Sequence, residues 1–325
     1  MKIVAGLGSV DEYIPYVQAG ADELFCGYVP YNWTKKYGTV LPLNRREVLA
    51  YNVQLGSFSE LEILSAMIRK YRKPVHIAMN SLYYIPEQYE EIADIVKQCM
   101  KIGFDSFILA DPALILYLRQ KGISCKIHLS GEAGEMNREA IKVFREMGIG
   151  RIIFHRKNTV ASMRQMIEAV NAEKLEFEAF ALNELCQFTG AFCNSLHCDE
   201  MGYLCRTTYW GDAEMEERME RVIKRTLEIE EQQEQQYLCG KSGCASCALP
   251  QLEAAGITHL KLVGRGNYVE DMIRDIRNLK AALGVLEENQ REEKETGRYI
   301  DQLNKKIFDG QPCGNNCIYN PGQFL

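Results

Sequence analysis

The chain has 325 residues, of which 46% are hydrophobic and 25% charged. This balance is typical of a folded domain with a sizeable core and disfavours a largely disordered protein. The formal charge of −6 disfavours a broad nucleic-acid surface, which needs excess Lys and Arg to displace phosphate counterions. No apolar run is long enough for a membrane helix, and the start MKIVAGLGSVDEYIP lacks the long apolar stretch of a secretory signal. We therefore expect a cytoplasmic protein that does not act at a membrane.

Short β-rich runs alternate with amphipathic helical stretches along most of the chain. A capping box of Ser57 and Glu60 predicts the start of a helix after residues 29–56, which are loop-like. The runs that predict strands are residues 2–8, 21–28, 74–80, 104–110, 124–130, 150–155, 175–182 and 258–264. Eight strands with helices between them predict an α/β fold, a (β/α)8 TIM-barrel-like domain. A doubly wound sheet is the alternative.

The predicted barrel-type domain covers residues 1–282 and contains a Cys-rich insertion, residues 183–250, after the seventh strand. Within this insertion, residues 211–236 are highly charged and predict an exposed helix. Residues 283–325 are predicted to form a polar helix and a Cys-containing C-terminal tail.

Cysteine usage is unusual for a cytoplasmic protein, because the chain has twelve. A reducing compartment argues against a disulfide framework. Cys26, Cys99 and Cys125 lie singly in apolar segments and are expected to be buried, inert thiols. The other nine follow residue 180, a bias that points to binding of a soft metal.

Four of these cysteines fall near one end of the predicted barrel. Barrel enzymes carry their chemistry at the C-terminal ends of the strands, and a [4Fe–4S] cluster needs four thiolate ligands. The four are Cys186, Cys193, Cys205 and Cys244. Zinc is the rival, because Cys193 with Cys198 and two further pairs have zinc-like spacing. The residues alone leave cluster, zinc and plain thiols open.

A second metal site is a separate prediction. It requires the C-terminal tail to fold back over the mouth of the barrel. Its ligands would be Cys239, Cys247, Cys313 and Cys317.

Polar residues that follow the predicted strands indicate an anionic substrate. Arg265 lies in a Gly-flanked turn before a helix, a setting that attracts anions, and Arg156 and Arg206 are expected at the same rim. His155 is the first candidate for a general acid. The predicted catalytic residues are His155, Arg156 and Glu132. The predicted substrate-binding residues are Arg265, Arg206, Ser130, Asn137 and Asn80.

The segment LEFEAFALNELCQFTGAFC resembles the one that marks the collagenase-like peptidases of family U32, where two cysteines are separated by six residues. AGADELFCG, IHLSGEAGEMN, CASCALPQLEAAG and AAGITHLKLVGR resemble other segments of that family, so the resemblance covers roughly residues 2–282. The chain departs from the family pattern at Asn183, where a His is expected nearby, and at Lys157 and Val263, which replace acidic residues.

The resemblance implies a cluster enzyme. In better understood members four cysteines ligate a [4Fe–4S] cluster and serve oxygen-independent hydroxylation of tRNA uridine, ribosomal RNA cytidine or the ubiquinone ring, with prephenate as the implied hydroxyl source. By position the ligands carry over to Cys186, Cys193, Cys205 and Cys244, and Cys247 competes for the fourth place. A small anionic substrate is expected, and RNA is expected only by family analogy.

Two other functional hypotheses stand beside this one. The family name suggests a peptidase or other hydrolase, although no HExxH or G-x-S-x-G motif is present. The alternative is a non-catalytic, cluster-bearing partner of another subunit, since some relatives act as pairs. A homo-oligomer is also compatible with the sequence.

Overall fold

Eight parallel strands close into a barrel in chain order, so the (β/α)8 prediction is confirmed. This computed structural model describes residues 1–38, 41–45, 53–170, 174–183, 193, 239–240, 242–291, 296–310 and 316–319. The strands are β1 (Lys2–Leu7), β2 (Glu23–Gly27), β3 (Val75–Met79), β4 (Ser106–Leu109), β5 (Lys126–Leu129), β6 (Arg151–Ile153), β7 (Glu176–Leu182) and β8 (His259–Leu262). All eight fall within the predicted runs.

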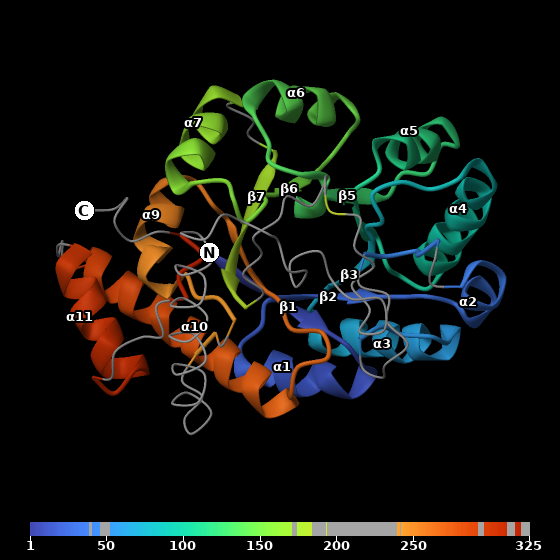
Figure 1. Ribbon diagram of the computed structural model, residues 1–325. Coiled ribbons are helices and arrows are strands. Elements are labelled where there is room, and N and C mark those ends of the chain that lie inside the picture. The colour runs from blue at the N-terminus through green and yellow to red at the C-terminus, as the bar shows by residue number, and fades with distance from the viewer. Residues whose placement is uncertain are drawn as a thin grey trace, which may run out of the picture.

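Helices surround the strands in Figure 1, where α1 and α3 lie below the barrel, α4 and α5 to the right, and α6 and α7 above it. The helices are α1 (Tyr13–Ala19), α2 (Tyr31–Tyr37), α3 (Phe58–Tyr71), α4 (Pro86–Lys101), α5 (Pro112–Gln120), α6 (Arg138–Glu146), α7 (Val160–Val170), α9 (Leu249–Ala254), α10 (Val269–Arg291) and α11 (Thr296–Ile307). Short 3-10 turns are η1 (Val10–Glu12), η2 (Gly131–Ala133) and η5 (Ser246–Ala248). None of the described helices is long and apolar enough to cross a membrane.

The predicted start of α3 is confirmed. The Ser57 side chain accepts a hydrogen bond from the backbone N–H of Glu60, and the Glu60 carboxylate accepts one from the backbone N–H of Ser57. These two bonds satisfy backbone donors that the first turn of a helix leaves without intrahelical partners.

Two segments differ from the prediction. Residues 31–37, expected in a loop, form α2 because the Trp33 side chain is fully buried and its indole N–H donates to the Leu41 carbonyl. The helix α10 runs without a break to Arg291, past the expected domain boundary at residue 282. The expected polar helix after 282 is present as the rest of α10 and as α11, whose Tyr299 and Leu303 join the main core. The helix predicted over residues 211–236 lies outside the described residues.

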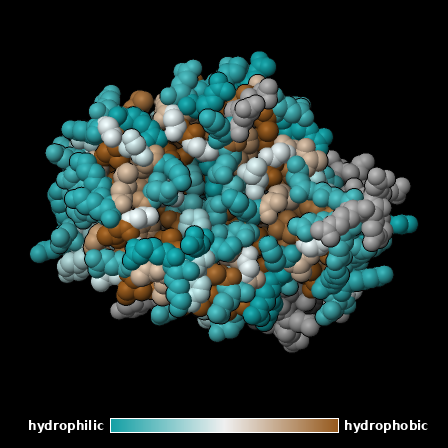
Figure 2. Space-filling view, turned by 180° about the vertical axis from the view of Figure 1, so that it is seen from behind, coloured by the Kyte–Doolittle hydropathy of each residue, from teal (hydrophilic) through white to brown (hydrophobic). Residues whose placement is uncertain are grey.

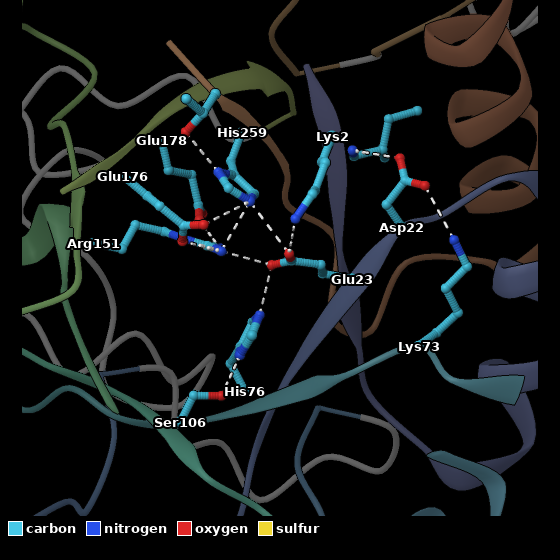
Figure 3. Close-up of polar contacts among 12 residues, drawn as sticks. Lys2, Asp22, Glu23, Lys73, His76, Ser106, Arg151, Glu176, Glu178 and His259 are labelled. Atoms are coloured by element: carbon cyan, nitrogen blue, oxygen red, sulfur yellow. Dashed lines mark hydrogen bonds and ion pairs between the residues drawn. The ribbon is translucent and has the colours of Figure 1, made fainter. Parts of the chain in front are cut away.

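The interior of the barrel holds an ion network at its N-terminal end, in place of an apolar layer. Glu23, Arg151 and Glu176 are the first residues of β2, β6 and β7 (Figure 3). Arg151 lies 2.8 Å from Glu23, 2.8 Å from Glu176 and 3.0 Å from Glu178, and its side chain is 3% exposed. Lys261 donates to Glu178 at 3.0 Å. One buried arginine thus joins strands from opposite sides of the barrel.

Two histidines complete this network. His76 lies between Glu23 (2.9 Å from Nε2) and Ser106 (2.5 Å from Nδ1), and His259 lies 3.2 Å from Glu23. Burial alone would raise the pKa of the Glu23 carboxyl, but hydrogen bonds to both histidines and the charge of Arg151 hold it well below its usual range. Burial lowers the pKa values of His76 and, with help from the neighbouring His76, of His128.

The Arg151→Ala variant should be strongly destabilised. Removing the guanidinium leaves Glu23 and Glu178 buried without their cation, and breaking such a pair typically costs about 3–5 kcal/mol. Urea unfolding followed by circular dichroism measures the loss. The matched control is Arg138→Ala, whose exposed ion pair with Glu139 should leave the unfolding midpoint unchanged. Equal stability of the two variants would contradict a structural role for the network.

Stability should decrease as the pH falls below about 6.5, the pKa of histidine in an unfolded chain. His76 and His128 have lowered pKa values in the fold, so below that pH the unfolded state binds more protons and is favoured. Below about pH 4.3 protonation of Glu23 in the unfolded state adds to the loss, because its folded pKa is depressed. Urea unfolding at a series of pH values measures the slope. His128→Leu should reduce that slope by up to about 1.4 kcal/mol per pH unit, and an unchanged slope would contradict the assignment.

Candidate functional site

The C-terminal ends of the eight strands and the loops that follow them form the mouth of the barrel. Here Glu132, in η2 after β5, lies between two arginines. Its carboxylate is 3.2 Å from Arg45 and 3.4 Å from Arg156, and the three side chains are only 7–14% exposed. The guanidinium of Arg156 also stacks on the Phe180 ring at 4.0 Å. The mouth therefore orders two arginines around one carboxylate.

Polar groups from neighbouring strands brace this arrangement. Asn80, which follows β3, accepts a hydrogen bond from the backbone N–H of Arg45 and donates one to Ser130 at 3.3 Å. Ser130, after β5, accepts one from the backbone N–H of Glu132 at 3.2 Å. Four predicted residues, Asn80, Ser130, Glu132 and Arg156, are thus brought together by the fold.

Arg265 points into the mouth as predicted. The residue is 5% exposed, and its guanidinium lies 5.8 Å from the Phe25 ring centroid. It crosses the end of β2 so closely that a Cβ atom on Gly27 would come within 2.6 Å of Nη1. Glycine is therefore required at position 27 for the arginine to lie there. With Arg45, Arg156 and Glu132, the charge of this group is formally +2, which suits an anion.

The other predicted residues of the mouth have different outcomes. His155 is 1% exposed, and burial, assisted by the charge of Arg156, lowers its pKa. Its Nδ1 accepts a hydrogen bond from the backbone N–H of Lys157, so the neutral ring carries its proton on Nε2, which can donate a hydrogen bond. The role of His155 as a general acid stays a prediction. Asn137 caps α6 by accepting from two backbone N–H groups, which commits its side chain to the helix end. Arg206 lies outside the described residues.

Cys244 lies in a loop that is anchored to the end of β7. The backbone N–H of Ala245 donates to the Ala181 carbonyl at 2.8 Å, and Leu182 and Cys244 form an antiparallel bridge. A hydrogen bond with Cys239 lowers the pKa of the Cys244 thiol to about 7 and raises that of Cys239. Cys244 also meets the Ser246 hydroxyl, at 3.4 Å. Its environment therefore favours a thiolate, the form that binds metals.

The rest of the predicted ligand sets is only partly described. Cys193 is 5% exposed, while Cys186 and Cys205 lie outside the described residues. For the second site, Cys317 pairs with Cys244 through the backbone, so residues 316–319 do fold back as that prediction requires, but Cys313 is outside. Within the described part of the chain, no group of three or more His, Cys, Asp or Glu side chains is arranged to hold a metal ion.

A buried carboxylate that the sequence reading missed fixes the cysteine loop. Asp275, fully buried on α10, accepts hydrogen bonds from the Asn183 side chain (2.8 Å) and from the backbone N–H of Gly240 (2.9 Å). Asn183 has a φ of 67° and also donates to the Val263 carbonyl. The sequence pattern could have indicated that Asp275 is buried, because Asp275 lies between Met272 and Leu279 on the apolar face of a helix.

The family model of peptidase family U32 matches residues 8–314, most of the chain. The chain belongs to peptidase family U32. The resemblance to this family of the segment that contains Cys186 and Cys193 is thereby confirmed.

Curated relatives of this U32 chain are named for tRNA hydroxylation. Identity with "tRNA hydroxylation protein P1" of Bacillus subtilis (strain 168) is 22% over 214 residues, 64% of this chain and 46% of that protein. Identity with "tRNA hydroxylation protein P" of Escherichia coli (strain K12) is 25% over 174 residues, 54% of this chain and 34% of that protein. The chain thus spans less than half the length of both relatives. Among solved structures, the U32 peptidase Mk0906 aligns with a TM-score of 0.42 and 15% identity over 56% of this chain and 69% of that one.

The donor chemistry of the described residues fits the iron–sulfur cluster that the family implies. Cys193 is buried after β7, as a ligand sheltered from solvent would be. Cys244, on the loop anchored to β7, has the thiolate character that iron ligation needs. Both belong to the ligand set predicted from the sequence.

The Asp275→Ala variant should loosen the cysteine loop. It leaves the Asn183 amide and the Gly240 N–H without their acceptor in a buried setting, at a cost of about 1–3 kcal/mol for each group. We expect faster alkylation of Cys239 and Cys244 by iodoacetamide, measured by peptide mass spectrometry. Asp271→Ala, on the same helix but 30% exposed, is the matched control and should not change the rate. Equal rates in both variants would show that Asp275 does not hold the loop.

Proposed function

We propose that this U32 chain is a [4Fe–4S]-dependent enzyme of oxygen-independent hydroxylation or a related group transfer, acting on an anionic substrate at the mouth of the barrel. The observation that carries the proposal is the excess positive charge of Arg45, Arg156 and Arg265 at the mouth, the end of the barrel where the Cys244 loop is anchored to β7. An anion held by these arginines would lie next to the ligands of the cluster.

Cys186, Cys193, Cys205 and Cys244 would hold the cluster, with Cys247 as competitor for the fourth place. When bound, the cluster supplies Lewis-acid or electron-transfer chemistry. The chain's own residues bind and orient the substrate. Arg156 and Arg265 provide charged donors, and Glu132 fixes the direction of the Arg156 guanidinium. Neutral His155, whose Nδ1 accepts from the backbone N–H of Lys157, would donate a hydrogen bond from Nε2.

The substrate class is part of the proposal. The names of the relatives favour RNA, and prephenate is the hydroxyl source that the family resemblance implies. Three tyrosines that follow strands at the mouth are the most exposed large hydrophobic residues of the described chain. They are Tyr31, Tyr83 and Tyr268, whose exposed fractions lie between 66% and 80%. On the opposite side of the molecule from Figure 1, hydrophobic residues appear as separated patches among hydrophilic ones (Figure 2). Exposed tyrosines and buried arginines on loops at the same end of the barrel suit a nucleotide, whose base stacks and whose phosphate pairs.

The hydrolase alternative has one suggestive geometry. Ser106, His76 and Glu23 form a hydrogen-bonded chain that resembles a catalytic triad. Ser106 is, however, 2% exposed and is the first residue of β4, at the end of the barrel opposite the mouth. A substrate cannot reach such a hydroxyl without opening the barrel. The three hydrogen-bonded side chains are therefore better explained as part of the ion network.

Anaerobic purification should yield a coloured protein with about four iron and four sulfide per chain, since a cubane cluster has that composition. Cys193→Ser and Cys244→Ser should each lose most of this iron, measured by visible and EPR spectra and by metal analysis. Cys99→Ser is the matched control, because burial raises the pKa of this lone thiol on α4 to about 12. The fourth ligand is decided by comparing Cys244→Ser with Cys247→Ser: the variant that loses the iron identifies it. A colourless protein with stoichiometric zinc would refute the cluster.

A further inference from the structure

Residues 316–319 of the C-terminal tail lie against the loop of Cys244. The backbone N–H of Cys244 donates to the Asn316 carbonyl, and the N–H of Ile318 donates to the Cys244 carbonyl, both at 2.9 Å. The Asn316 side chain adds a bond to the Gly240 carbonyl at 2.6 Å. Since Cys244 is bridged to Leu182 on its other side, the tail extends the chain pairing that begins at the end of β7.

This pairing buries the two residues that follow Cys317. Ile318 is 8% exposed and Tyr319 is 5% exposed, and both belong to the main hydrophobic core. Tyr319 is within electrostatic reach of Arg156 and near the backbone of Phe180, whose ring carries the Arg156 guanidinium. The tail therefore brings a tyrosine to the arginine group of the mouth.

The hydroxyl of Tyr319 is the unexplained part of this arrangement. It is shielded from solvent and makes no hydrogen bond of acceptable geometry to the described residues. A buried hydroxyl without such a bond is unfavourable, and native structures usually satisfy it with a protein group, water or ligand. The Nη2 atom of Arg45, another buried donor of the mouth, likewise makes no hydrogen bond to the described residues.

We propose that Tyr319 is a substrate-binding residue whose hydroxyl donates to an oxygen of the anion held by the arginines. The shared chemistry of the ligand is an oxyanion, either a phosphate or a carboxylate. This inference rests on the anion site of the proposed function and adds to it that the C-terminal tail completes the site. Because phenylalanine fills the same space, the hydroxyl can be tested apart from the packing of the ring.

Titration calorimetry of the full chain with inorganic phosphate, and separately with malonate, tests the proposal. Tyr319→Phe should weaken binding of one of these anions about tenfold, the usual worth of a hydrogen bond to a charged group. The anion that responds identifies a phosphoryl or a carboxylate ligand. Tyr16→Phe, which removes the hydroxyl of a fully buried tyrosine on α1, is the matched control and should bind like the wild type.

The outcomes separate this inference from the proposed function. Binding by the wild type that Arg156→Gln weakens and Tyr319→Phe does not would keep the anion site and overturn the role of Tyr319. Absence of binding by the wild type, or binding that Arg156→Gln leaves unchanged, would overturn both. If Tyr319→Phe fails to fold, hydrogen exchange of the wild type decides: the amides of residues 316–319 should exchange more slowly with saturating anion, and an unchanged rate would contradict the proposal.

Discussion

The fold depends on the charged side chains inside the barrel, above all on Arg151 and its three carboxylate partners (Figure 3). Burying charges is unfavourable unless each finds a partner, so the network is weak as a source of net stability but strongly selective for one arrangement. A slip of β2 or β7 by one residue would turn Glu23 or Glu178 out of the barrel and leave Arg151 buried alone. The interior charges therefore specify the register of the strands.

Because of this network, the two ends of the barrel differ in charge. At the N-terminal end, the three carboxylates of Glu23, Glu176 and Glu178 outnumber the cations of Arg151 and Lys261. The Phe25 ring lies between the two ends. Its centroid is 3.7 Å from Lys261 of the ion network and 5.8 Å from Arg265 of the mouth. At the mouth, Arg45 and Arg156 both pair with Glu132, and Arg265 lies over the end of β2. The positive charge that an anion needs is thus concentrated at the end where barrel enzymes bind their substrates.

Local patterns were enough to predict all eight strands and the start of α3, because buried parallel strands and capping boxes have strong local signatures. They were enough to choose Asn80, Ser130, Glu132, Arg156 and Arg265, since each follows a strand. Arg45 was missed because it lies in a loop without periodicity, and Tyr319 because only pairing with Cys244, far away in the chain, brings it to the mouth. Asn137 caps α6, and its role in substrate binding stays a prediction, because a helix cap and a binding residue look alike in sequence.

Two of the three departures of this chain from the family pattern are connected in space. The family pattern expects a histidine near position 183 and a glutamate at position 263. In this chain the Asn183 amide donates a hydrogen bond to the Val263 carbonyl at 3.2 Å. They therefore belong to one local hydrogen-bonded group, in which Asp275 also takes part beside the cysteine loop. Asp275 is fully buried and engaged on both oxygens, so its role is structural. Glu132 and His155 lie beside Arg156 instead, so among the described residues they are better placed than Asp275 to act on a bound anion.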